Sequence, residues 1–136
     1  MFKLGEKYCR TVMKVKDRFS KLGFLQTVKL LEGSVNENGL KVVSIVDAQA
    51  NLNKIGAEAH RNKILEIFNP KLVKEVFECD LRAGIVPPLR IYIYEEDGKT
   101  HVATQSAVDL FAPYNGLSDL AERVDRMIQA SIRPIE

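Results

Sequence analysis

Residues 89–104 read Leu-Arg-Ile-Tyr-Ile-Tyr-Glu-Glu-Asp-Gly-Lys-Thr-His-Val-Ala-Thr, and this alternation of apolar and polar residues predicts a β-hairpin. The pair Asp97-Gly98 at its centre is typical of a two-residue turn, because glycine readily adopts the positive φ that such a turn requires. With the turn fixed, the register follows by counting, and it pairs Tyr94 with His101, Ile93 with Val102 and Tyr92 with Ala103. We therefore expect Ile91, Ile93 and Val102 on one face of the hairpin, and Tyr92, Tyr94 and His101 on the other.

Strand and helix patterns flank this hairpin on both sides. Strands are predicted at 8–15, 40–46 and 63–68, the second of them buried, and helices at 24–35, 48–54, 71–79 and 107–112. Ser118 is predicted to cap a last helix with the core stripe Leu120, Val124, Met127, Ile128 and Ile132. This order predicts a single α+β domain over residues 1–136, a two-layer mixed sheet with helices packed on one face.

The composition is that of an ordinary globular protein, with 136 residues of which 46% are hydrophobic and 28% charged. It excludes disordered and fibrous classes, and no stretch approaches the ~18 apolar residues of a membrane span. The N-terminus lacks the apolar run of a signal peptide. We therefore expect a soluble cytoplasmic protein that contacts no membrane.

Cys9 and Cys79 are the only cysteines, and neither has a ligand-like partner at short spacing. A disulfide framework or a zinc site needs more cysteines or histidines than these, so we expect reduced, buried thiols and no metal or other cofactor.

The formal net charge of +2 hides an uneven distribution. Residues 1–41 hold nine Lys/Arg and four Asp/Glu, whereas residues 75–136 hold six and eleven. The basic excess comes from Lys3, Lys7, Arg10, Lys14, Lys16, Arg18 and Lys21. It indicates either a weak anion site or an edge strand kept soluble by lysines. No aromatic ladder accompanies these residues, so a nucleic-acid partner is not expected.

Two groups of residues are candidate ligand-binding sites. Tyr92, Tyr94 and His101 on one sheet face could bind a planar ligand or hold a proton donor, or they could cover the outer face or a dimer interface. Asn69-Pro70-Lys71 reads as a helix start, with Asn69 as N-cap and Lys71 adding charge. It could bind a small anionic ligand, or it could be an ordinary capped helix.

The remaining polar residues form no catalytic constellation. His60 is expected in a solvated loop, and Glu95, Glu96 and Asp97 in a solvated turn. No nucleophile elbow, Walker loop or dinucleotide-binding glycine pattern is present, so no catalytic residue is predicted.

Several short motifs together resemble the family called domain of unknown function 302. The resemblance extends over 48–132, and more weakly from Tyr8, and it is carried by Ala50, Leu52, Gly56, Asn69, Pro70, Lys71, Leu72, Pro88, Leu89, Arg90, Tyr94, Glu95 and Gly98. The chain departs from the family pattern at Phe68, Val73, Lys74, Thr104 and Ala107. Phe68 replaces a glycine before Asn69, which puts in doubt any binding through that turn.

The resemblance implies a compact fold similar to one half of the TATA-box-binding-protein-like architecture, forming a homodimer, with no settled activity. Our leading hypothesis is a homodimeric binding or interaction domain without catalytic machinery. One alternative is a small enzyme that uses His101 and a neighbouring Tyr as an acid–base pair in a cleft. Another is an anion- or nucleotide-binding protein that uses the Asn69–Lys71 helix start.

Overall fold

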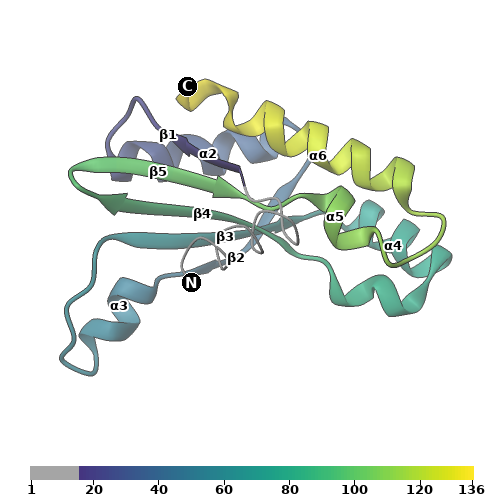
Figure 1. Ribbon diagram of the computed structural model, residues 1–136, viewed down its shortest axis with the longest axis horizontal. Helices are drawn as coiled ribbons and strands as arrows, with labels where there is room; N and C mark the ends of the chain where they lie inside the picture. Colours follow the sequence, from purple (N-terminus) through teal and green to yellow (C-terminus); the bar gives the residue numbers. More distant parts are fainter. Residues whose placement is uncertain (1–15) are drawn as a thin grey trace, which may run out of the picture.

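The computed structural model describes residues 16–136, in which five strands form one sheet with a helical layer on one face (Figure 1). The order across the sheet is β1-β5-β4-β3-β2, and every pairing between these strands is antiparallel. The strands are β1 (Lys16–Phe19), β2 (Lys41–Val46), β3 (Asn62–Phe68), β4 (Leu89–Glu96) and β5 (Lys99–Thr104). The predicted α+β class is confirmed, but the described sheet is antiparallel rather than mixed.

The helices are α2 (Phe24–Glu37), α3 (Ala48–Asn53), α4 (Pro70–Cys79), α5 (Ala107–Phe111) and α6 (Ser118–Ile132), with two short 3₁₀ helices, η1 (Leu81–Ile85) and η2 (Arg133–Ile135). Helices α2, α3 and α4 connect successive strands, and α5 and α6 follow the last strand. Helix α2 packs on β2, β3 and β4, and α6 lies beside α2 (Figure 1). Within residues 16–136, no helix combines the length and apolar character of a membrane span.

The β4–β5 hairpin has the predicted register. Tyr94 pairs with His101, Ile93 with Val102 and Tyr92 with Ala103. At the turn, Asp97 has φ 53° and Gly98 has φ 73°, as a two-residue turn with two positive φ angles requires. Ile91, Ile93 and Val102 are fully buried under the helical layer, so the core side of the hairpin follows from the turn.

Three local predictions need correction. Strand β2 was expected to be buried, but it is an edge strand with Val43 57% and Ile45 45% exposed. Ser118 is the first residue of α6, and the capping position belongs to Leu117, which supplies no side-chain hydrogen bond. Cys79 is an exposed free thiol rather than a buried one. The predicted strand 8–15 and Cys9 lie outside the described residues.

The turn predicts a difference between two glycine-to-alanine substitutions. Gly98→Ala should lower the free energy of unfolding by about 1 kcal/mol, because its φ of 73° is costly for a residue with a Cβ, although nothing lies within 4 Å of the added atom. Gly33→Ala, inside α2 and equally uncrowded, should raise stability by about 0.5–1 kcal/mol. Urea denaturation of both variants measures this, and a stable Gly98→Ala variant would contradict the turn assignment.

Candidate functional site

The sheet face opposite α2 carries a concentration of aromatic and polar side chains. The pairings place on this face Asp17 and Phe19 from β1, His101 and Ala103 from β5, Arg90, Tyr92 and Tyr94 from β4, and Asn62 and Ile64 from β3. We call it the aromatic face. Ile91, Ile93 and Val102, which lie between them in sequence, point the other way into the core, because side chains alternate along a strand. Arg18 also points to that side, where it donates a hydrogen bond to Gln129 of α6.

Four rings on this face form a continuous aromatic stack. The Tyr92 and Tyr94 ring centroids lie 4.9 Å apart at 19°, and those of Tyr94 and His101 lie 4.4 Å apart at 15°. Phe19 tilts at 54° onto His101 with its centroid 4.7 Å away. The predicted trio of Tyr92, Tyr94 and His101 is therefore brought together, and Phe19 from the edge strand extends it.

Asp17 ties the stack to β1 through polar contacts. The Tyr94 hydroxyl donates a hydrogen bond to Asp17 Oδ2 at 2.9 Å, and His101 Nδ1 lies 3.7 Å from the same oxygen. The second distance is too long for a hydrogen bond, but a protonated imidazole there is attracted to the carboxylate. Asp17 and Phe19 were not predicted, because the predicted first strand ends at residue 15. No local pattern in the sequence indicates that this strand pairs beside His101.

The surroundings of Tyr94 keep its hydroxyl protonated. Burial is the largest cause, followed by the hydrogen bond to Asp17 and the negative charge of that carboxylate, and together they raise the pKa of Tyr94 to about 12. At neutral pH the hydroxyl is thus a fixed hydrogen-bond donor. A group that exchanges protons in catalysis works best with a pKa near the working pH, and the pKa of Tyr94 lies well above neutral pH.

A groove of about 350 Å³ lies on the aromatic face at the Tyr92 end of the stack. Its lining residues are Ala48, Asn62, Ile64, Arg90, Tyr92, Ala103, Thr104 and Gln105. The volume is within the roughly 300–1,000 Å³ range of small-molecule sites, which combine apolar walls with a few polar groups. Tyr92 was a predicted site residue, but the groove was not predicted, because its walls come from four separate segments.

The polar groups of the groove are held by local contacts. Gln105 Oε1 accepts a hydrogen bond from the backbone N–H of Arg90 at 2.9 Å. Because the bonded atom must be the oxygen, the Gln105 amide NH₂ remains a donor. Asn62 Nδ2 donates to the carbonyl of His60 at 2.9 Å, which leaves Asn62 Oδ1 as an acceptor. The groove therefore offers donors at one end and an acceptor at the other.

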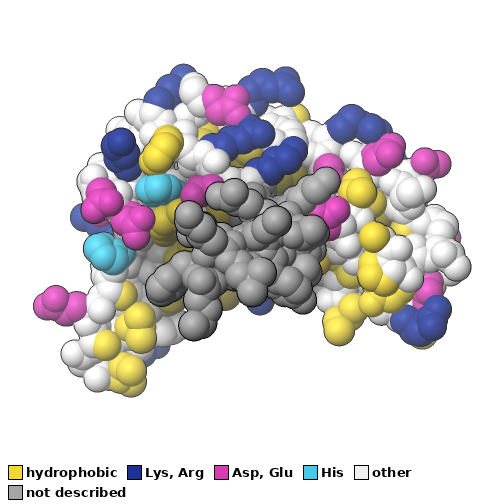
Figure 2. All heavy atoms as spheres, viewed as in Figure 1, with side chains coloured by type: hydrophobic (Ala, Val, Ile, Leu, Met, Phe, Trp, Pro, Cys, Tyr) yellow, Lys and Arg dark blue, Asp and Glu magenta, His cyan; other side chains and the backbone are white. Residues whose placement is uncertain are grey.

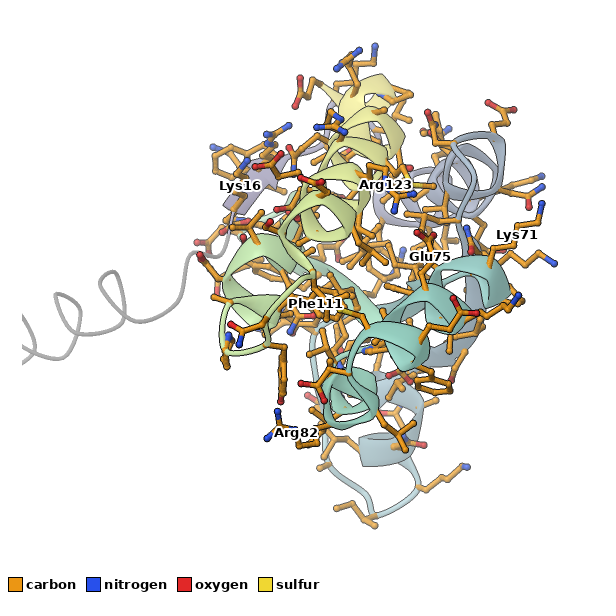
Figure 3. The ribbon with its side chains drawn as sticks, turned by 90° about the vertical axis from the view of Figure 1, so that its right-hand side faces the viewer. Lys16, Lys71, Glu75, Arg82, Phe111 and Arg123 are labelled. Carbon is orange, nitrogen blue, oxygen red and sulfur yellow. The ribbon has the colours of Figure 1, made fainter. Side chains whose placement is uncertain are left out.

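The Asn69–Lys71 helix start is separate from the aromatic face. Asn69 Oδ1 accepts from the Leu72 N–H at 2.8 Å, and Asn69 Nδ2 donates to the Gly39 carbonyl at 2.6 Å, so the side chain caps α4 and ties it to the end of α2. Lys71 projects to solvent, while Glu75 on the same helix turns toward Arg123 of α6 at 2.7 Å (Figure 3). Anion binding there stays a prediction without a further contact to support it.

The other residues named from the sequence as solvated are exposed, except Glu95, which is half-buried. His60 is exposed in the loop before β3, and Glu96 and Asp97 are exposed at the hairpin tip. Both histidine side chains are visible on the left of Figure 2, each near acidic side chains. Among residues 16–136, no three His, Cys, Asp or Glu side chains gather as metal ligands would.

Comparison with known proteins gives one consistent result. The family model "Domain of unknown function DUF302" matches residues 16–135. The fold is similar to that in the crystal structure of an uncharacterized conserved protein DUF302 from Bacillus stearothermophilus, with a TM-score of 0.83 and 21% sequence identity over 90% of this chain and 98% of that chain. None of the curated proteins compared matches the chain. At this identity the solved structure supports the fold alone.

The contact between Asp17 and Tyr94 predicts a change in the tyrosine titration. Asp17→Asn removes the carboxylate charge and should lower the pKa of Tyr94 from about 12 toward 10, without reaching it because burial remains. Tyrosine Cζ shifts followed by NMR against pH measure this. The control is Asp97→Asn at the turn, where asparagine tolerates the positive φ.

The same shift predicts a pH dependence of stability. The folded-state pKa of Tyr94 is raised, so its contribution is fully present below pH 10 and is lost as the pH rises through about 12. Asp17→Asn should weaken this loss. A Tyr94 titration that is identical in wild type and Asp17→Asn would mean that the hydrogen bond does not form in solution.

Proposed function

The chain belongs to the DUF302 family of domains of unknown function, and from this premise we propose that it is a small binding domain that takes a small molecule in the groove of the aromatic face. The observation that carries the proposal is the position of the groove. It begins where the aromatic stack ends, at Tyr92, which is 37% exposed. An exposed ring backed by further stacked rings is a rigid wall for a ligand.

The groove has an apolar floor and a polar rim, and the two contribute differently to binding. Ile64 and Ala103 flank Tyr92 on the neighbouring strands and give an apolar floor. Arg90 and Gln105 supply donors at the rim. Apolar walls provide most of the binding free energy and a few polar groups fix the orientation, so this arrangement suits a small organic ligand.

The enzyme alternative finds less support in the same geometry. It requires a tyrosine hydroxyl within hydrogen-bond reach of His101 in a cleft. The ring of Tyr94 stacks on His101, and its hydroxyl donates its hydrogen bond to Asp17. Tyr92 lines the groove without His101. We therefore retain binding without catalysis as the proposed function.

We propose that the partner of this domain is a second copy of the chain, which pairs along the edge strand β2. The other edge, β1, carries Lys16, Asp17 and Arg18, and such charges discourage pairing between strands. Strand β2 instead presents Val43 and Ile45 with large exposed fractions. An exposed apolar edge is a template for another strand, and two antiparallel copies of β2 can pair about a two-fold axis.

Further apolar side chains extend the β2 edge into a surface of useful size. Val43 and Phe77 line one shallow hollow, and the ring of Phe77 packs against Gly84 of η1. Leu81 and Ile85 on η1 are 73% and 82% exposed, and hydrophobic side chains gather in this region at the lower right of Figure 2. We propose that this surface and β2 form a homodimer interface.

We also propose that the protein is cytoplasmic, because a free thiol such as that of Cys79 is typical of a reducing compartment.

The binding proposal predicts that a panel of small organic molecules contains compounds that raise the melting temperature. A ligand at one hundred times its Kd adds about 2.7 kcal/mol, which corresponds to a rise of roughly 5–10 °C. Tyr92→Val removes the wall and should abolish the rise, whereas Tyr92→Phe keeps the ring and should preserve it. Native mass spectrometry of freshly purified protein shows whether a molecule is retained. The proposal fails if no compound shifts wild type, or if Tyr92→Val responds as wild type does.

The interface proposal predicts a dimer at micromolar concentration, with about twice the chain mass of 15.3 kDa, by size-exclusion chromatography with light scattering. Val43→Asp places a charge in the middle of the edge and should give a monomer. Leu25→Asp on α2, where the leucine is 64% exposed against 57% for Val43, should remain a dimer. A monomeric wild type across the micromolar range would rule out the dimer, and a dimeric Val43→Asp would rule out this interface.

A further inference from the structure

We infer that the ligand of the groove is a planar aromatic carboxylate, whose ring stacks on the face of Tyr92 turned away from Tyr94 and whose carboxylate is held by Arg90 and Gln105. This inference rests on the proposed function and adds the chemical class of the ligand. It joins three features of β4: a stack with one end in the groove, a gap of suitable length, and a cation at the far side of that gap.

The stack determines the shape of the ligand. Tyr94 stacks with both Tyr92 and His101, and Phe19 packs on His101, so Tyr92 is the end of the stack that lines the groove. Parallel rings at the observed angles of 19° and 15° indicate that the cluster accepts flat partners in offset stacking. A planar ring in the groove would continue the series, whereas a bulky aliphatic group would leave that face of Tyr92 poorly packed.

The residue spacing along β4 indicates where the ligand ring lies. Arg90 and Tyr92 are two residues apart on the same face, which separates them by roughly 6.8 Å along the strand. Stacked rings lie roughly 3.5–4 Å from their neighbours, so the interval between Arg90 and Tyr92 has room for at most one ring. Both residues line the groove, so this interval opens into it.

The charge at the rim determines the acidic group. The Arg90 side chain is 56% exposed, and its Nε lies 3.8 Å from Glu66 Oε2 on the neighbouring strand. Because Glu66 is paired with Nε, the two terminal nitrogens of Arg90 can hold a carboxylate in a two-point contact. The Gln105 amide NH₂, fixed beside Arg90 by the 2.9 Å contact to its backbone, is a further donor.

Glu66 limits the charge that this end of the groove accepts. Its carboxylate orients Arg90 through Nε and offsets part of the positive charge. One guanidinium beside one acidic side chain, with a neutral amide as the other donor, matches a singly charged carboxylate better than a doubly charged phosphate. The ligand class is therefore an aromatic ring with one carboxylate.

The test compares 2-naphthoate with its neutral isostere 2-naphthamide on the full chain. We expect 2-naphthoate to bind at least fivefold more tightly in titrations followed by NMR, with the largest amide shifts at residues 90–92 and 103–105. Arg90→Gln should weaken 2-naphthoate about tenfold and leave 2-naphthamide unchanged, because it removes a charged hydrogen-bond donor. Arg126→Gln, the same change at an exposed arginine of α6, should bind both probes as wild type does. Circular dichroism confirms that each variant is folded.

The outcomes separate this inference from the proposed function. If both probes bind equally and Arg90→Gln binds 2-naphthoate as wild type does, the groove binds rings without selecting an acid. The inference is then overturned while the proposed function stands. If neither probe binds but another compound of the panel raises the melting temperature through Tyr92, the ligand class is again wrong. If neither probe nor any panel compound binds, both proposals fall together.

Discussion

The two-residue turn at Asp97 and Gly98 holds β4 and β5 in a single register, and both faces of the sheet follow from it. Because side chains alternate with a period of two, a slip by one residue would move every side chain of the strand to the opposite face. It would expose Ile91 and Ile93, which are fully buried now, and turn the two tyrosines toward the helical layer. The turn therefore positions the core and the aromatic face together.

The magnitudes show why no other register competes. Burying an isoleucine fully contributes about 1.5–3 kcal/mol, so the loss of Ile91 and Ile93 from the core would cost several kcal/mol. A polar group buried without a partner adds about 1–3 kcal/mol for each hydroxyl or imidazole. These losses are comparable to the whole stability of a domain of this size. The helical layer on one face thus fixes the position of the aromatic stack on the other.

The parts of the structure that sequence could predict are those set by local chemistry. The hairpin register, the Asn69 cap and the helix periodicities depend on neighbouring residues, and the structure confirms them. The exposure of β2 depends on which strand lies at the edge, and its apolar sequence is typical of buried and exposed strands alike. The contact of Asp17 with Tyr94 spans 77 residues and forms only because β1 pairs with β5. No local pattern encodes it.

The series of aromatic residues on this face of β4 ends at the groove. Tyr94 and Tyr92 continue the stack from His101, and the next residue on that face is Arg90 instead of a third ring. A further aromatic residue there would stack on Tyr92 and fill the groove with the protein's own side chain. Arginine has a planar group that can lie over a ring or grip a carboxylate, yet it leaves space between itself and Tyr92. The change from Tyr to Arg along one strand thus converts the end of a structural stack into an opening with a charge at its rim.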